Sequence, residues 1–336
     1  MASAAAEDGT CAAALAAATD ASSSSSWTMI LLAVLAIPTI VWLLTYTIPQ
    51  LIMAFRAVPD LKKKYDAEWA LVTGGGSGIG KSLAFKLASQ GLNVVIVSLD
   101  DDFLKETMKQ LKDKYPDLKF RSVGVNFAPN TDYMKPIREA TDDLHIQCIF
   151  NNAGFLVTGF FDQAPLPKLM VNMECNATAA FQITHHFVGK LVSKKSRGCV
   201  VFTSSVAGYV PTPFSSSYGA TKAFISQLAC CLHIELKSLG IDVCAVNPSP
   251  VASNFYAKLD HKIDLLESAR KQAVTPDALP DEMFKSIGMC ALRDVGGMAL
   301  GTRMGTFFIA YNFFTGIFAA AAPYLPDYKT HSKTRK

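Results

Sequence analysis

The chain has 336 residues, half of them apolar, and a formal net charge of +4. This length accommodates one large domain with appended segments, and the apolar content is sufficient for a sizeable core. The small net charge, without a basic block interleaved with aromatic residues, excludes a nucleic-acid-binding surface from the interpretation. The eight cysteines show no C-x-x-C spacing, so we expect reduced, mostly buried thiols and no metal site.

The N-terminal residues 1–26 are almost all Ala and Ser, and Glu7, Asp8 and Asp20 are their only charges. This composition predicts a disordered tail, because it offers too little apolar surface to bury. A transit peptide fits poorly, since such peptides carry Arg and avoid acidic residues.

An uncharged stretch at residues 27–55 is long enough to cross about 30 Å of hydrocarbon at about 1.5 Å per residue. We predict a transmembrane anchor, in which Pro38 and Pro49 are tolerated as in other membrane spans. A cleaved signal peptide is a poorer interpretation, because the stretch is too long and basic residues follow it. Acidic residues precede the span and Arg56 and 62–64 follow it, so the positive-inside rule places the globular part in the cytosol.

The globular part is predicted at residues 56–302, where short apolar runs alternate with helical patterns from Trp69 onward. Such alternation is typical of an α/β fold with a doubly wound parallel sheet. The predicted strands are 69–73, 93–98, 119–125, 146–151, 198–204, 241–247 and 297–301.

The C-terminal residues 303–336 are predicted to form a hydrophobic, membrane-associated segment with a basic tail. Residues 304–326 carry no charge, and glycines and prolines interrupt them. Basic residues lie on both sides, which favours an interfacial or re-entrant segment over a full crossing. A wall of a substrate site and a buried helix at a dimer interface are the other interpretations.

A glycine-rich turn follows the first predicted strand, with Gly74, Gly78 and Gly80 in the spacing G-x-x-x-G-x-G. Glycines in such a turn let the backbone approach a pyrophosphate that sits at a helix N-terminus. The turn predicts a dinucleotide cofactor, with Ser77 and Ile79 among the residues that contact it.

A tyrosine and a lysine, Tyr218 and Lys222, lie four residues apart in a predicted helix and therefore share one of its faces. The ammonium can then lie under the phenol and favour its ionised form. Ser205 precedes this pair by thirteen residues. The three residues predict a site for acid–base chemistry.

The ordered set of motifs resembles the short-chain dehydrogenase/reductase family. The set comprises the glycine-rich turn, the sequence NNAG at 151–154, Asn176, Ser205 and the Tyr218–Lys222 pair. The resemblance implies a Rossmann fold and NAD(P)-dependent reduction of a carbonyl. In the family's tetrad, Tyr218 would donate the proton, and Lys222 would keep the phenol acidic and hold the nicotinamide ribose. Ser205 would orient the carbonyl, and Asn176 would hold a water in a proton relay.

Further cofactor contacts are implied by the same resemblance at Asn126, Asn152, Val251 and Ser253. The chain departs from the family at the end of the second strand, where Ser98 and Leu99 replace the residues that normally select the cofactor. There Asp100 would favour NAD(H), whereas Lys105 or Lys81 would favour NADP(H). We expect NADP(H) in preference to NAD(H).

The anchor and the aromatic C-terminal run resemble a membrane-bound group, the very-long-chain 3-oxoacyl-CoA reductases and 17β-hydroxysteroid dehydrogenases type 12. The group implies an endoplasmic-reticulum enzyme, facing the cytosol, that reduces the 3-oxo group of a long-chain acyl-CoA in fatty acid elongation. The expected partners are the membrane, a lipid-like carbonyl substrate and a second copy of the chain. A 3-ketosphinganine, steroid or retinal reductase is an alternative, and a non-catalytic, membrane-tethered binding protein on the same fold is another.

Overall fold

The computed structural model describes residues 4–257, 259, 261, 263–271 and 273–333, with side chains from residue 26 onward except those of residues 265 and 269. The chain divides into two compact units, Met1–Arg56 and Ala57–Lys336. The predicted basic tail extends into residues 334–336, which lie outside the described residues.

The first unit consists of one long helix, α1 (Ala4–Phe55). Its part from Ser26 to Phe55 is long and apolar enough to cross a membrane, and Pro38 and Pro49 lie inside it. The helix continues to Ala4 through the Ala- and Ser-rich stretch for which the composition predicts disorder. Alanine has the highest helix propensity, which accounts for this extension. Disorder of residues 1–26 stays a prediction.

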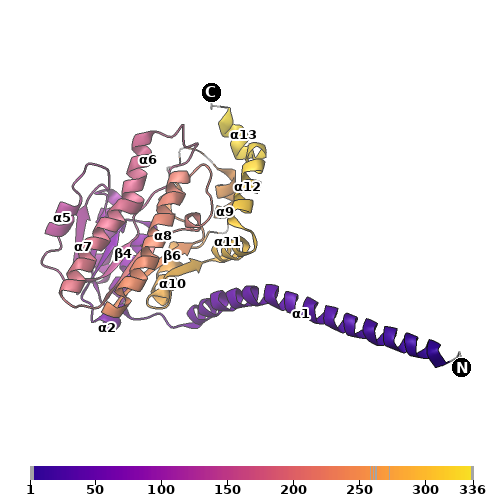
Figure 1. Ribbon diagram of the computed structural model, residues 1–336. Coiled ribbons are helices and arrows are strands. Elements are labelled where there is room, and N and C mark those ends of the chain that lie inside the picture. Colours follow the sequence, from indigo (N-terminus) through magenta and orange to yellow (C-terminus); the bar gives the residue numbers. More distant parts are fainter. Residues whose placement is uncertain (1–3, 258, 260, 262, 272, 334–336) are drawn as a thin grey trace. The chain divides into compact units, whose positions relative to one another are not determined.

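The second unit contains a sheet flanked by helices (Figure 1). The sheet has seven parallel strands in the order β3-β2-β1-β4-β5-β6-β7. The strands are β1 (Trp69–Thr73), β2 (Asn93–Ser98), β3 (Phe120–Gly124), β4 (Ile146–Asn151), β5 (Gly198–Thr203), β6 (Ile241–Pro248) and β7 (Leu292–Val295). The strand order reverses between β1 and β4, as in a doubly wound fold. The predicted fold class is confirmed.

Helices follow most strands and supply the parallel crossovers. They are α2 (Leu61–Tyr65), α3 (Gly78–Ser89), α4 (Asp102–Lys114), α5 (Met134–Glu139), α6 (Leu166–Met173), α7 (Ala179–Ser193), α8 (Ser216–Leu236), α9 (Asp264–Arg270), α10 (Leu279–Ser286), α11 (Gly297–Phe308), α12 (Tyr311–Ala321) and α13 (Pro326–Ser332).

Two hydrophobic cores cover the two faces of the sheet. In β2, Val94 and Ile96 belong to the core with α3, α4 and α10, whereas Val95 and Val97 belong to the core with α5, α7 and α8. Successive side chains of a strand point to opposite faces, so a strand buried on both sides needs an uninterrupted apolar run. This requirement explains why the central strands could be recognised in the sequence.

The predicted strand at 297–301 is wrong, because these residues begin α11. The seventh strand lies earlier, at Leu292–Val295, and contains Arg293 and Asp294. Both charges are buried and paired, Arg293 with Glu282 and Asp294 with Arg303. Two adjacent charges hide a strand from a search for apolar runs, since the pairing that permits their burial is tertiary.

The uncharged C-terminal run forms two helices separated by a sharp bend. The axes of Gly297–Phe308 and Tyr311–Tyr324 differ by 108°, and together they pass the length and composition test for a broken membrane span or a re-entrant loop. These helices belong to the same compact unit as the sheet.

We expect Gly80→Ala to destabilise the protein by about 1–3 kcal/mol, the usual range for overpacking. An added Cβ would overlap the carbonyl oxygen of Gly74 and lie 2.6 Å from Nδ2 of Asn152. The matched control is Gly189→Ala in α7, where a Cβ meets nothing within 4 Å. That change is expected to stabilise the protein by about 0.5–1 kcal/mol through helix propensity. Denaturant unfolding of both variants measures the difference, and equal stabilities would contradict the close packing at Gly80.

Candidate active site

A large cavity lies at the carboxyl edge of the sheet, where the strand order reverses. Its volume is about 920 Å³. Gly74 follows β1 and Asn152 follows β4, and both line it. In open α/β sheets, ligands bind at this topological switch point.

The glycine-rich turn forms one wall and has the geometry of a phosphate cradle. Gly74 has φ +66° and Gly78 has φ +54°, in the left-handed region that favours glycine. A Cβ on Gly74 would lie 2.8 Å from Cα of Ala153. Ser77 stands at the N-cap of α3 without a side-chain hydrogen bond to the helix, so backbone N–H groups are available to an anion. The turn therefore fits the pyrophosphate of a dinucleotide.

Polar side chains join the ends of three strands beneath the cavity. The hydroxyl of Thr73 accepts hydrogen bonds from the backbone N–H groups of Asn152 and Ala153 at 2.9 and 3.0 Å. The amide of Asn152 donates to the carbonyl oxygens of Thr73 and Gly74 at 3.3 and 3.4 Å. Its Oδ1 accepts from the Thr203 hydroxyl at 3.0 Å. These bonds fix the turn after β1 to the ends of β4 and β5.

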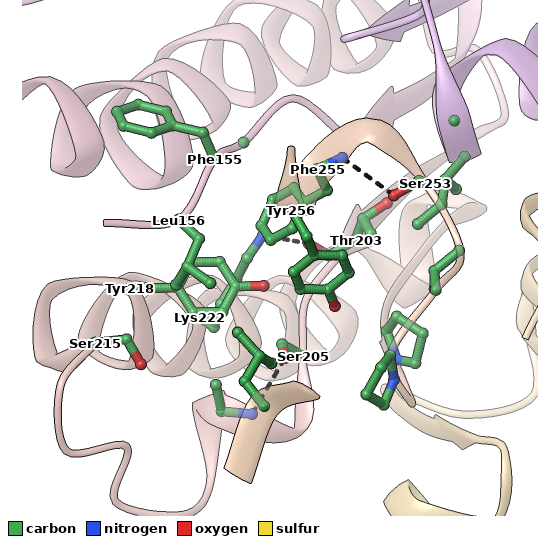
Figure 2. A pocket seen from close by; sticks show the side chains of 18 of the residues that line it. Phe155, Leu156, Thr203, Ser205, Ser215, Tyr218, Lys222, Ser253, Phe255 and Tyr256 are labelled. Atoms are coloured by element: carbon green, nitrogen blue, oxygen red, sulfur yellow. Dashed lines mark hydrogen bonds between the residues drawn. The ribbon is translucent and has the colours of Figure 1, made fainter. Parts of the chain in front are cut away.

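The Tyr218–Lys222 pair lies on the face of α8 that borders the cavity (Figure 2). Nζ of Lys222 lies 5.5 Å from the centroid of the Tyr218 ring and donates to the carbonyl oxygen of Thr203 at 2.7 Å. Burial lowers the pKa of Lys222 to about 8, and the thiol of Cys175 acts in the opposite direction. The pKa of the amine therefore lies close to neutral pH, and the hydrogen bond to Thr203 fixes the position of Nζ.

The phenol of Tyr218 points into the cavity toward Tyr256 (Figure 2). Burial raises the pKa of Tyr218, and the nearby phenol of Tyr256 raises that pKa further. A hydrogen bond with Ser205 acts in the opposite direction and lowers it. The net shift of the pKa is upward, opposite to the lowering expected from Lys222, and the phenol is held in its protonated form. Ser205 itself caps the short 3₁₀ turn Val206–Gly208, since its hydroxyl accepts from the N–H of Ala207 at 3.2 Å.

Asn176 lies in a π-helical turn, Glu174–Thr178, between α6 and α7. Its Oδ1 accepts from the N–H of Phe155 at 2.9 Å, and its Nδ2 donates to the carbonyl oxygen of Phe155 at 2.9 Å. Nδ2 also lies 3.3 Å from the hydroxyl of Thr221. Such local π-turns are frequent at functional sites. Here the turn aims Asn176 at the backbone beside the cavity.

Most of the predicted site residues are brought together around this one cavity. Those that line it are Gly74, Ser77, Gly78, Ile79, Asn126, Asn152, Ser205, Tyr218, Lys222, Val251 and Ser253. Asn176 lies directly behind the wall, and Gly80 packs beneath the turn.

Asp100 is not brought into the cavity. A Cβ on Gly124 would lie 2.8 Å from Cβ of Asp100, so this side chain lies over the end of β3. It borders a separate hollow with Lys105, which pairs with Asp102 at 3.7 Å. The cavity is lined instead by Asp101, whose carboxylate caps α4 by accepting from the N–H of Leu104.

Several cavity residues were missed by the sequence analysis. They are mostly apolar and come from the loop after Asn152, the loop after Ser205, the turn after β6 and the C-terminal part of the chain: Phe155, Leu156, Val210, Pro211, Phe255, Tyr256, Met298, Thr302, Phe314, Phe318 and Leu325. The uncharged run after Arg303 was the signal for Phe314, Phe318 and Leu325. Of the interpretations left open for that run, a wall of the substrate site fits these positions.

Comparisons with known proteins agree with this geometry. A sequence model described as short chain dehydrogenase matches residues 68–264. The very-long-chain 3-oxoacyl-CoA reductase of Rattus norvegicus is 35% identical over 192 residues, which are 55% of this chain and 60% of the rat protein. The protein of the same name from Macaca fascicularis is 31% identical over 228 residues, 66% of this chain and 69% of that protein. The match thus spans less than two thirds of the rat relative's length.

A further relative and two solved structures extend the comparison. Putative steroid dehydrogenase 2 of Caenorhabditis elegans is 35% identical over 210 residues, 60% of this chain and 65% of that protein. A structure from a study of 7β-hydroxysteroid dehydrogenase stereoselectivity superposes with a TM-score of 0.66 at 24% identity, covering 74% of this chain and 94% of that chain. A short-chain dehydrogenase from Sphingobium yanoikuyae in complex with NADPH gives a TM-score of 0.63 at 24% identity, covering 75% and 95%. At these identities the two structures support the fold.

We expect Tyr218→Phe to lower carbonyl-reducing turnover by about 10²–10⁴-fold, the usual contribution of a positioned proton donor. Nucleotide affinity should be nearly unchanged, because the hydroxyl alone is removed. Steady-state turnover and nucleotide titration on the same preparation separate the two effects. Lys222→Met is the companion variant and should weaken both. Undiminished turnover of Tyr218→Phe would refute the role of the phenol.

Proposed function

The chain belongs to the short-chain dehydrogenase family and is an NAD(P)-dependent oxidoreductase, and we propose that it reduces the 3-oxo group of a long-chain acyl-CoA. The observation that carries this proposal is the position of Tyr218 and Lys222 at the junction of two regions. On one side lies the phosphate cradle of the glycine-rich turn. On the other side lies an apolar chamber that is closed by the C-terminal helices.

The protein's own residues would hold the substrate and supply the proton. The bound nicotinamide cofactor supplies the hydride. The Tyr218 hydroxyl, kept protonated by burial, donates its proton to the carbonyl oxygen as general acid. The Ser205 hydroxyl, at the cap of its turn, hydrogen-bonds the same oxygen and stabilises the negative charge that develops there.

Lys222 and Asn176 would support the proton donor rather than contact the carbonyl. The ammonium of Lys222 lies beside the phenol and favours the phenolate that remains after proton transfer. It would also hold hydroxyls of the nicotinamide ribose. Asn176 holds the Phe155 carbonyl and lies next to Thr221 of α8, so the proton relay of the family would pass along this side of the helix.

A lipidic substrate is supported by what lines the chamber. Phe155, Leu156, Met298, Phe314 and Phe318 present apolar side chains to it. The volume of about 920 Å³ is that of the whole cavity, which the nucleotide and the substrate would share. The relatives named very-long-chain 3-oxoacyl-CoA reductase support the acyl-CoA assignment. The relative named putative steroid dehydrogenase supports a steroid carbonyl as the second candidate.

The proposed cofactor is NADP(H). At the end of β2, Ser98 and Leu99 line the cavity in place of a carboxylate that would hold the ribose of NAD. Asp100 lies over β3, outside the cavity, so it does not oppose a 2′-phosphate there. The Asp101 carboxylate is engaged at the N-terminus of α4.

We further propose an endoplasmic-reticulum membrane protein whose globular part faces the cytosol. In this arrangement residues 27–55 anchor the chain, 56–302 form the catalytic domain and 303–336 contact the membrane. The length and apolarity of Ser26–Phe55 and the basic residues that follow it support the proposal.

The reaction is tested with the full chain in detergent, offered a 16-carbon 3-oxoacyl-CoA with NADPH or NADH. We expect nucleotide oxidation with NADPH, at a higher kcat/KM than with NADH, because Ser98 stands where a carboxylate would hold the NAD ribose. A 3-oxosteroid is the parallel substrate. Turnover of the steroid alone would replace the acyl-CoA assignment, and nucleotide binding without turnover of either would contradict the proposed reaction.

The orientation is tested in sealed microsomes that carry the full chain with an epitope tag after Lys336. Protease added outside is expected to remove the tag, while alkaline extraction leaves α1 in the membrane. The control is a lumenal marker that stays intact until detergent is added. A tag that resists protease in sealed vesicles would contradict the cytosolic orientation.

A further inference from the structure

A partly buried ion pair joins the last strand to the apolar C-terminal helices. Arg303, in α11, donates from Nε to Oδ2 of Asp294 at 2.9 Å and from Nη2 to Oδ1 at 3.3 Å. The Asp294 side chain in β7 is 4% exposed, and its Oδ1 also accepts from Nδ2 of the buried Asn247 at 3.0 Å. Two hydrogen bonds between one guanidinium and one carboxylate fix the orientation of the guanidinium as well as its distance from the carboxylate.

The same guanidinium lies flat on an aromatic ring from a different segment. Its central carbon is 3.6 Å from the ring centroid of Tyr209. The Tyr209 hydroxyl donates to the carbonyl oxygen of Ala299, in α11, at 2.9 Å. Residues of α11 thus contact both the ring face and the hydroxyl of Tyr209. Arginine is suited to this double role, because its planar group pairs with a carboxylate and stacks on a ring at once.

Tyr209 belongs to the loop that begins at Ser205. Its N–H donates to the carbonyl oxygen of Val206 at 3.1 Å, which closes the turn that Ser205 caps. On the other side this turn rests on α8, since a Cβ on Gly208 would lie 2.8 Å from the carbonyl carbon of Lys222. The loop is therefore held between α8, which carries the Tyr218–Lys222 pair, and α11.

The loop and α11, which this contact joins, both line the cavity. The loop contributes Val206, Val210 and Pro211, and α11 contributes Met298 and Thr302. The stacked and hydrogen-bonded contact between Tyr209 and α11 therefore sets the separation of two walls of the chamber. Arg303 and Tyr209 themselves stand outside the lining.

We propose that Arg303 and Tyr209 are positioning residues that fix the width of the apolar chamber and thereby set its affinity for a long acyl chain. The inference rests on the proposed function in taking a lipid chain as the occupant. It assigns no chemistry to either residue, because neither reaches the reacting atoms. Their loss should change chain binding while Tyr218, Lys222 and the glycine-rich turn continue to act.

The test uses the full chain in detergent, loaded with NADP⁺ and labelled by a 16-carbon fatty acid that carries a photoreactive diazirine. For Arg303→Met we expect the concentration for half-maximal labelling of the α12 peptide to rise about tenfold, equivalent to about 1.4 kcal/mol. Nucleotide affinity should stay within about twofold. With a 16-carbon 3-oxoacyl-CoA, KM should rise by a similar factor while kcat changes less than about threefold.

Two further variants distinguish a specific loss of chain binding from a general loss of folding. Arg303→Lys keeps a cation for Asp294 and should recover part of the lost affinity. Tyr209→Leu leaves the ion pair intact and removes the stacking and the bond to Ala299, so it should raise the labelling concentration as well. The matched control is Arg121→Met: Arg121 makes two bonds to Asp143 at 2.7 and 3.0 Å and lies 5.9 Å from the Trp69 ring, remote from the cavity lining.

The outcomes separate this inference from the proposed reaction. Labelling that depends on Arg303 and Tyr209 in a protein that does not turn over acyl-CoA would sustain the inference and refute the reaction. Unchanged labelling in both variants would overturn the inference, as would a wild-type chain that is not labelled at α12. A parallel loss of nucleotide affinity, kcat and labelling, unrecovered in Arg303→Lys, would show a purely structural role.

Discussion

The side chain of Asn152 holds together the ends of three parallel strands, and the geometry of the whole cavity depends on it. Its amide donates to the carbonyl oxygens of Thr73 and Gly74, and its Oδ1 accepts from the hydroxyl of Thr203. The carbonyl oxygen of Thr203 in turn accepts from the ammonium of Lys222 at 2.7 Å. An uninterrupted series of hydrogen bonds thus runs from the glycine-rich turn to α8. A parallel sheet permits this arrangement because the carboxyl ends of its strands meet at one edge.

This frame has an electrostatic cost at Lys222. A lysine whose pKa falls from the ordinary 10.5 to about 8 binds its proton less tightly in the folded chain than in the unfolded one. The difference corresponds to about 3 kcal/mol of lost stability wherever the amine is charged in both states, which is below pH 8. The loss diminishes as the pH rises from 8 toward 10.5, where the unfolded chain also loses the proton. A buried amine with such a cost is typical of a residue retained for its chemistry.

The sequence was sufficient for the features that depend on local pattern. The sequence reveals the turn from Gly74 to Gly80 because glycines are needed where the backbone adopts such conformations. It reveals the Tyr218–Lys222 pair because residues four positions apart share one face of a helix. Each feature is determined by a few neighbouring residues. The direction of Asp100 could not, since it depends on the close approach of Gly124 from β3. The strand β7 was hidden by buried charges that are neutralised only in the folded chain. The apolar cavity lining was missed because its residues come from segments that lie far apart in the sequence and meet only in the folded chain.

The C-terminal run from 304 to 326 has no charge, so polar contacts can fix it to the rest of the domain mainly at its two ends. At the first end stands the Arg303–Asp294 pair, and just past the second the carboxylate of Asp327 accepts from the N–H of Asp264 at 2.7 Å. Between these two points α12 turns Phe314 toward the cavity, while the ring of Phe313 is 66% exposed. A segment whose polar attachments lie mainly at its ends can present apolar side chains on both sides, and an exposed apolar side of this kind is typical of a surface that contacts another apolar phase or partner. In the proposed function, the same run would line the chamber that holds the acyl chain and would also contact the membrane.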